Sequence, residues 1–197
     1  YDKDSRWWST PYDVTNSFFT GFSHVNLSGV GCPELGSLLL MPTTGTLEVD
    51  YHRYGTEYSS ETARPGYYGV KLDKYDILAE ATATTRTGVS RFTFPAGQAN
   101  ILLNLGEGLT NETGASVRRV NAREFEGSKL LGTFCYNPQA VFPIYFVMRV
   151  SKTPESSGFW KMQRPMKGVE AEWDKDNGYH KVGGQAVLGR QFNGATP

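Results

Sequence analysis

The chain has 197 residues, with 20 basic and 20 acidic side chains, so its formal net charge is zero. A neutral chain lacks the basic surface that binds a phosphate backbone, and its longest apolar run (38–41) is far shorter than the roughly 20 residues that span a bilayer. We therefore expect neither a nucleic-acid partner nor membrane insertion. The 39% hydrophobic and 20% charged residues indicate a soluble globular protein and exclude a disordered one.

The length suits one domain of sandwich or barrel size, or two small ones. The 22 Gly, 10 Pro and 13% aromatic residues favour β-structure with many turns. The chain begins at Tyr1, without an initiator Met or signal peptide, and ends at Pro197. We expect either a processed chain or a piece of a longer protein.

Short apolar or alternating segments between turn residues predict strands along the chain. They cover 36–41, 46–51, 66–72, 77–87, 90–94, 99–105, 116–126, 129–135, 143–151 and 184–192. No convincing window of some ten residues has apolar positions at helical spacing, and the best short helical candidate is 168–175. About ten strands without helical crossovers predict an all-β fold of antiparallel sheets, hence a sandwich or barrel.

The acidic residues do not identify a catalytic pair. Hydrolysis of a glycoside needs two carboxylates across a cleft, but no spacing selects two of these: Glu34, Glu61, Glu80, Glu107, Glu112, Asp174 and Asp176. Ser23 and His24 are adjacent in sequence, which does not aim one side chain at the other, and no nucleophile elbow is present. From its own residues the chain shows no catalytic site.

Metal-binding and redox motifs are equally weak. Three His and two Cys have no zinc spacing, and the acidic turn 174–178 lacks the glutamate that completes a calcium loop. We therefore expect no metal site on this chain. Cys32 and Cys135 form either one bridge or two buried thiols, and the sequence leaves both open.

Two adjacent indoles stand near the start of the chain. Trp7 and Trp8 lie in a polar setting, and in a strand they would point to opposite faces. One ring would then be exposed, as in proteins that hold the apolar face of a sugar. The alternative is that one ring packs in the core and the other covers a neighbouring domain.

The segment 21–31 is the most unusual string of the sequence. Phe22, His24, Asn26 and Ser28 alternate, so an imidazole, an amide and a hydroxyl would line one side of an extended segment. Such groups hydrogen-bond sugar hydroxyls, which both donate and accept. A buried polar loop that braces the sheet would explain the same pattern.

This string carries a family resemblance. GFSHVNLSGVGCPELGSLLLMPTTG (21–45) resembles the N-terminal block of glycoside hydrolase family 92, and ETARPGYYGVKLDKYDILAEATATTRTGVSRFTFP (61–95) resembles a second block of that family in the same order. The resemblance extends to about Gly108. Ser90 stands where many members carry His.

The resemblance implies a calcium-dependent, inverting exo-α-mannosidase from bacteria, built from an N-terminal β-supersandwich similar to galactose mutarotase and a C-terminal (α/α)₆ barrel. The barrel supplies the catalytic acid and base and binds the calcium, which this chain does not. Residues 1–197 are then a single β-sandwich domain or most of one. It helps close a pocket that cleaves terminal α-linked mannose from glycans, including N-glycans, in a secreted, periplasmic or cell-surface enzyme.

On this interpretation the recognition residues are Trp7, Trp8, His24 and Asn26, and no catalytic residue lies in the chain. Two other functions stay open. A stand-alone carbohydrate-binding or lectin-like module would bind mannosides as the isolated chain. A structural sandwich used for protein contacts would show no dependence on sugar.

Overall fold

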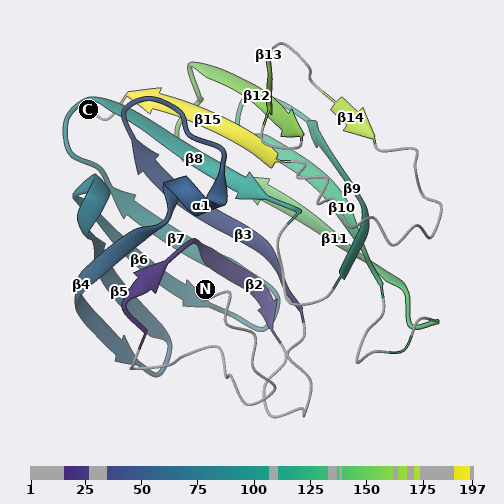
Figure 1. Cartoon of the computed structure of the whole chain (residues 1–197), viewed down its shortest axis with the longest axis horizontal. Helices are drawn as coiled ribbons and strands as arrows, with labels where there is room; N and C mark the ends of the chain where they lie inside the picture. Colours follow the sequence, from purple (N-terminus) through teal and green to yellow (C-terminus); the bar gives the residue numbers. More distant parts are fainter. Residues whose placement is uncertain are drawn as a thin grey trace.

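The computed structural model describes residues 16–26, 35–106, 111–132, 137, 139–161, 164–167, 171–173 and 189–195. Most of these residues form antiparallel strands, which confirms the expected all-β sandwich (Figure 1). The strands are β1 (Phe18–Phe19), β2 (Phe22–Asn26), β3 (Leu35–Thr44), β4 (Thr56–Arg64), β5 (Tyr67–Leu72), β6 (Ile77–Ala83), β7 (Gly88–Thr93), β8 (Gln98–Asn104), β9 (Asn111–Arg119), β10 (Glu124–Gly132), β11 (Phe142–Arg149), β12 (Ser156–Lys161), β13 (Arg164–Lys167), β14 (Ala171–Trp173) and β15 (Gly189–Ala195). Two short helices, α1 (Tyr51–Tyr54) and η1 (Asp73–Tyr75), complete the described elements, and neither is long and apolar enough to cross a membrane.

The strands form three sheets. One has the order β1-β4-β5-β6-β7, a second β11-β10-β9-β14, and the third β13-β12-β15-β8-β3-β2. The six-stranded sheet lies between the other two, because its residues contribute to both hydrophobic clusters. Figure 1 shows its long strands β3, β8 and β15 running side by side.

The middle sheet is apolar on both faces. Met41 and Leu102 pack in the cluster shared with the five-stranded sheet, whereas Leu38 and Leu103 pack in the cluster shared with the four-stranded sheet. Side chains alternate between the faces of a strand, so adjacent leucines serve different cores. This explains why β3 and β8 read as continuous apolar runs.

The segment 46–51, expected as a strand, is an irregular approach to helix α1. The Asp50 carboxylate accepts a hydrogen bond from the His52 amide at 3.0 Å, and the Asp50 carbonyl accepts from the amides of Arg53 and Tyr54. Asp is a preferred residue at a helix N-terminus because its side chain satisfies an amide left free by the helix. The capping residue therefore outweighs the alternation that had predicted a strand.

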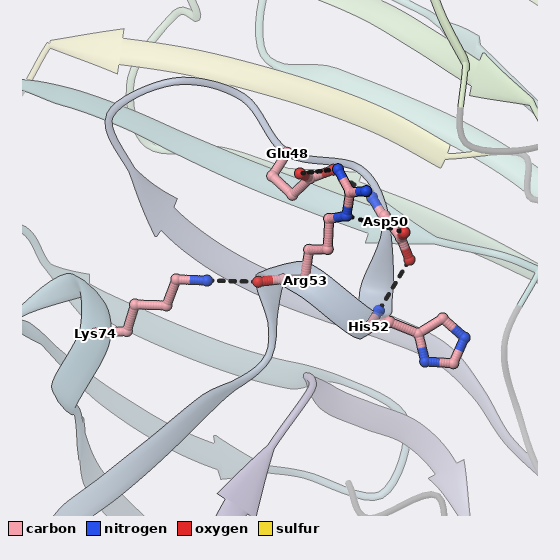
Figure 2. Close-up of polar contacts among 5 residues, drawn as sticks. All are labelled: Glu48, Asp50, His52, Arg53 and Lys74. Atoms are coloured by element: carbon pink, nitrogen blue, oxygen red, sulfur yellow. Dashed lines mark hydrogen bonds and ion pairs between the residues drawn. The ribbon is translucent and has the colours of Figure 1, made fainter.

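Figure 2 shows how α1 is held on the surface of the sandwich. The Arg53 guanidinium lies 3.8 Å from the Glu48 carboxylate and 3.7 Å from that of Asp50. The Lys74 ammonium, from η1, donates to the Arg53 carbonyl. Ion pairs at the surface each contribute at most about 1 kcal/mol. The hydrogen bond from Lys74 to Arg53 joins η1 to α1, so we interpret the cluster as a structural contact between the two short helices.

Two other expectations are wrong for local reasons. The segment 116–126 is not one strand, because a turn at 120–123 separates β9 from β10. In that turn the Asn121 side chain accepts from the Arg123 amide at 2.9 Å, an Asx turn that replaces the strand ladder. At the centre of the helical candidate 168–175, residues 171–173 form strand β14, which pairs with β9.

Candidate functional site

Strand β2 forms one edge of the six-stranded sheet and carries two of the four predicted recognition residues, His24 and Asn26. Its first residue, Phe22, is buried, with ring centroids 4.5 Å from Phe19 and 5.8 Å from Phe92. His24 follows two residues later on the same face of the strand and is half-buried. Phe22 is therefore a core residue that anchors the strand, and the polar character of this face begins at His24.

The His24 imidazole is held by two neighbouring strands. Its Nδ1 lies 3.1 Å from the Leu38 carbonyl of β3. Because a carbonyl oxygen can only accept, Nδ1 carries the proton, and a neutral ring then presents Nε2 as an acceptor. On the other side the ring lies against Gly88 of β7: a β-carbon there would stand 2.7 Å from Cδ2 and 2.8 Å from Nε2 of His24. Only glycine leaves room for the ring.

Immediately after His24 the strand becomes irregular. The register with β3 shifts between the pairs His24–Leu38 and Asn26–Leu35. Val25 has φ of 60° there, and Gly36 opposite has φ of 61°. Left-handed backbone is rare for a β-branched residue and costs of order 1–3 kcal/mol. Such strain and such bulges gather at functional sites, where they aim a side chain in a new direction.

The other predicted site residues are placed only in part. The Asn26 backbone pairs with Leu35 at the end of β2, so His24 and Asn26 share one strand end, but the Asn26 side chain lies outside what the structure describes. Trp7 and Trp8 also lie outside the described residues, as do Ser28, Cys32 and Cys135. The assignment of Trp7, Trp8, His24 and Asn26 to sugar binding stays a prediction.

Of the acidic candidates, Glu61 and Glu80 have described side chains, and both make hydrogen bonds. Glu61 accepts from the Tyr68 hydroxyl at 2.6 Å. Glu80 is bound by Nε and Nη2 of Arg91, both at 2.6 Å, and accepts from the Tyr67 hydroxyl at 3.0 Å. The Arg91 guanidinium holds the pKa of Glu80 below its ordinary value, with the Tyr67 hydrogen bond adding to the effect. A general acid needs a raised pKa, so Glu80 is unsuited to that role.

The remaining acidic candidates lie outside the described residues or have side chains that the structure does not describe: Glu34, Glu107, Glu112, Asp174 and Asp176. Among the described residues, no three His, Cys, Asp or Glu side chains come together as metal ligands. The acidic turn 174–178 falls outside the described residues, so the expectation that this chain holds no metal site stays a prediction.

Two features of this corner escaped sequence reasoning. The left-handed backbone of Val25 carries no sequence signal, because valine is a residue that ordinarily avoids it. The contact between His24 and Gly88 joins residues of two different sheets. Gly88 lies between the predicted strands 77–87 and 90–94, and the sequence gives no signal that links it to His24.

Comparison with known proteins identifies the domain family. The family model of the glycosyl hydrolase family 92 N-terminal domain matches residues 1–190. No curated protein matches the sequence.

Solved structures give the same result. The family GH92 α-mannosidase BT3965 from Bacteroides thetaiotaomicron, in complex with mannoimidazole, superposes with a TM-score of 0.77 and 27% identity, covering 100% of this chain and 28% of that one. The GH92 family glycosyl hydrolase ccman5 gives a TM-score of 0.75 and 26% identity over 93% of this chain and 25% of its own. The inverting mannosidase BT2199 from the same Bacteroides species, at 17% identity and a TM-score of 0.72, shares the fold.

The chain thus spans about a quarter of the length of these solved relatives. The family match covers His24, Val25 and Gly88, so the strained end of β2 belongs to the shared domain. This chain belongs to the glycosyl hydrolase family 92 N-terminal domain family.

Proposed function

We propose that the chain is the N-terminal domain of an inverting α-mannosidase that removes terminal α-linked mannose from glycans, N-glycans among them. In this role it helps close the mannose-binding pocket against a C-terminal (α/α)₆ barrel of the same parent protein. The proposal is supported by the family match and by relatives that are described as α-mannosidases and are about four times longer. The catalytic acid and base, and the calcium, would come from the barrel.

The observation that carries the proposal is the strained corner at the end of β2. His24 is fixed by the Leu38 carbonyl at Nδ1 and by the close approach of Gly88 to the Cδ2–Nε2 edge of its ring. Val25, which follows it, is held at φ of 60° and is 48% exposed. A rigid polar group beside a strained, exposed backbone is what a sugar-recognition edge needs, because preorganised groups lose little entropy on binding.

Further parts of the proposal concern the whole parent protein. Residues 1–197 would form one β-sandwich domain or most of one, of the galactose mutarotase type. The parent would act on extracellular glycans as a secreted, periplasmic or surface-bound enzyme. Trp7 or Trp8 would serve as a sugar platform or pocket wall, and Asn26 would hydrogen-bond a sugar hydroxyl.

The test is alanine substitution in the full-length parent, with hydrolysis of an aryl α-mannoside measured beside thermal stability. Removing a hydrogen bond or stacking surface to the sugar at Trp7, Trp8, His24 or Asn26 should cost about 1–3 kcal/mol, or roughly five- to 150-fold in kcat/KM. His52→Ala is the matched control, since this histidine is exposed on α1. It should leave kcat/KM unchanged.

Phe92→Ala is the control for folding. The ring packs against Phe22 and Phe94 at the edge of the core, so its loss should lower the free energy of unfolding by about 3–5 kcal/mol. If the four site variants lose stability but retain kcat/KM when folded, the segment is structural. If the isolated chain binds mannosides as tightly as the parent, the lectin-like alternative is favoured.

A further inference from the structure

A fully buried lysine lies between the six-stranded and four-stranded sheets. Lys129, on β10, has no exposed side-chain surface, and Phe125 and Leu131 on the same strand are also completely buried. Lysine is almost never fully buried unless its ammonium is paired, because burying a charge without partners is very unfavourable. The Lys129 ammonium therefore needs hydrogen-bond acceptors in the interior of the protein.

One acceptor of this ammonium is a backbone carbonyl of the neighbouring sheet. Lys129 Nζ donates to the Ser37 carbonyl of β3 at 3.0 Å. The bond joins residues far apart in the sequence and lies entirely in the interior. Hydrogen bonds from a charged donor are stronger than those between neutral groups, above all where water is excluded.

Ser37, like its neighbour Gly36, has no partner in the regular registers of β3 with β2 and β8. The ladder between β3 and β8 begins at Leu39–Asn104, so Ser37 lies beyond its end. On the other side, Ser37 falls within the register shift between His24–Leu38 and Asn26–Leu35. The Lys129 ammonium thus holds the β3 backbone at the one stretch where its strand neighbours leave the regular register.

The next carbonyl along the chain is the one that holds His24. Leu38 follows Ser37 directly, and its oxygen lies 3.1 Å from His24 Nδ1. A shift of the Ser37–Leu38 peptide would move this acceptor relative to the imidazole. The Gly36 backbone, at φ of 61°, would be free to follow such a shift.

We propose that Lys129 is a positioning residue: by binding the Ser37 carbonyl it fixes the β3 backbone that orients His24. The inference rests on the proposed function only for its effect on mannoside turnover. Lys129 touches no sugar in this scheme and acts only through β3 and the imidazole.

The first test is made on the 197-residue chain and does not depend on activity. Lys129→Met removes the donor and keeps an apolar chain of similar length, and Lys129→Gln keeps a neutral donor. Imidazole nitrogen NMR reports the tautomer and hydrogen bonding of His24, with exposed His52 as the internal reference. We expect Lys129→Met to weaken the His24 Nδ1 hydrogen bond to Leu38 and Lys129→Gln to retain it in part. Lys71→Met, at an exposed lysine paired with Asp76, should leave His24 unchanged.

The second test is made on the full-length parent. Lys129→Met should lower kcat/KM for an α-mannoside about tenfold, equivalent to roughly 1.4 kcal/mol, with partial recovery in Lys129→Gln. A folded Lys129→Met protein with wild-type His24 resonances and kcat/KM would overturn the inference. So would failure of both Lys129 variants to fold, because Lys129 would then serve only the stability of the core. If the His24 resonances move but the parent hydrolyses no α-mannoside, the positioning role stands and the proposed function fails.

Discussion

Gly88 and His24 lie so close that a β-carbon on the glycine would stand 2.8 Å from Nε2 of the imidazole. The two residues belong to the edges of two different sheets, β7 of the five-stranded sheet and β2 of the six-stranded one. The imidazole therefore sits where these sheets meet, against bare backbone on the side of β7. Any side chain at position 88 would displace the ring from this corner.

The first prediction is that Gly88→Ala destabilises the chain through this one contact. Forcing a methyl group into a filled space typically costs about 1–3 kcal/mol. In a His24→Ala background the methyl group meets no ring, so the cost of Gly88→Ala should fall close to zero. A double-mutant cycle by urea denaturation measures the coupling, and additive effects of the two substitutions would contradict the contact.

The second prediction concerns the left-handed backbone at Val25. Asparagine tolerates positive φ far better than a β-branched residue, so Val25→Asn should raise the free energy of unfolding by about 1 kcal/mol. Val89→Asn is the matched control, because Val89 has similar exposure, 52% against 48%, but lies in the regular strand β7. There the same change should be destabilising, since asparagine is a poor strand residue. If thermal or urea unfolding shows that both substitutions change the free energy of unfolding in the same direction, the result would argue against strain at Val25.

Tyr75 gives a prediction about alkaline pH. Its hydroxyl donates to the Tyr54 carbonyl at 2.8 Å, and burial, with a smaller contribution from the Glu48 charge, raises its pKa to about 12. A phenol with a raised pKa in the folded state stabilises the fold below the ordinary value near 10, and this contribution is lost as pH rises from about 10 towards 12. Tyr75→Phe should therefore be less stable than wild type at neutral pH, by about 0.5–1.5 kcal/mol, with the difference shrinking across that range.

Urea denaturation of both proteins at a series of pH values measures this difference. Tyr145→Phe serves as the control, because the Tyr145 ring is 77% exposed. That variant should follow the wild-type pH dependence throughout. A Tyr75→Phe difference that stays constant from neutral pH to about 12 would show that burial of the phenol does not couple its ionisation to folding.

The fourth prediction is that the isolated chain neither binds calcium tightly nor hydrolyses α-mannosides. An inverting glycosidase needs an acid and a base roughly 6.5–9.5 Å apart, and the Glu80 and Glu61 carboxylates are already committed to Arg91 and to a tyrosine hydroxyl. Calorimetric titration should detect no submicromolar calcium site. Turnover that survives purification and disappears on substitution of a single Asp or Glu of this chain would refute the prediction.

The sequence predicted the sheets better than the turns between them. Continuous apolar runs such as 38–41 and 101–103 identified strands. They did not reveal that both faces of the sheet are covered, with adjacent leucines packing into two different cores. The strand expected at 46–51 failed because a single side chain, that of Asp50, starts a helix. Short-range hydrogen bonds from side chain to backbone compete with strand formation, and the alternation of apolar and polar residues in the sequence does not reveal them.

For the candidate site, sequence reasoning found the strand but not its geometry. His24 was singled out for its polar alternation with Asn26, which the structure places at the same strand end. The close approach of Gly88 and the bond from Lys129 to Ser37 depend on packing between sheets, and no local window contains both partners. Such partners are fixed by tertiary structure alone.

The position of β15 sets the order in which the domain can be completed during synthesis. This strand, which follows all the other described strands in sequence, lies between β12 and β8 in the middle sheet. Until it leaves the ribosome, the long edge of β8 has no partner from that side, and β12 and β13 cannot join the sheet through it. An apolar strand with an open edge is prone to pair with other chains. Nascent chains lacking residues 189–195 should therefore depend on chaperones more than the finished domain does.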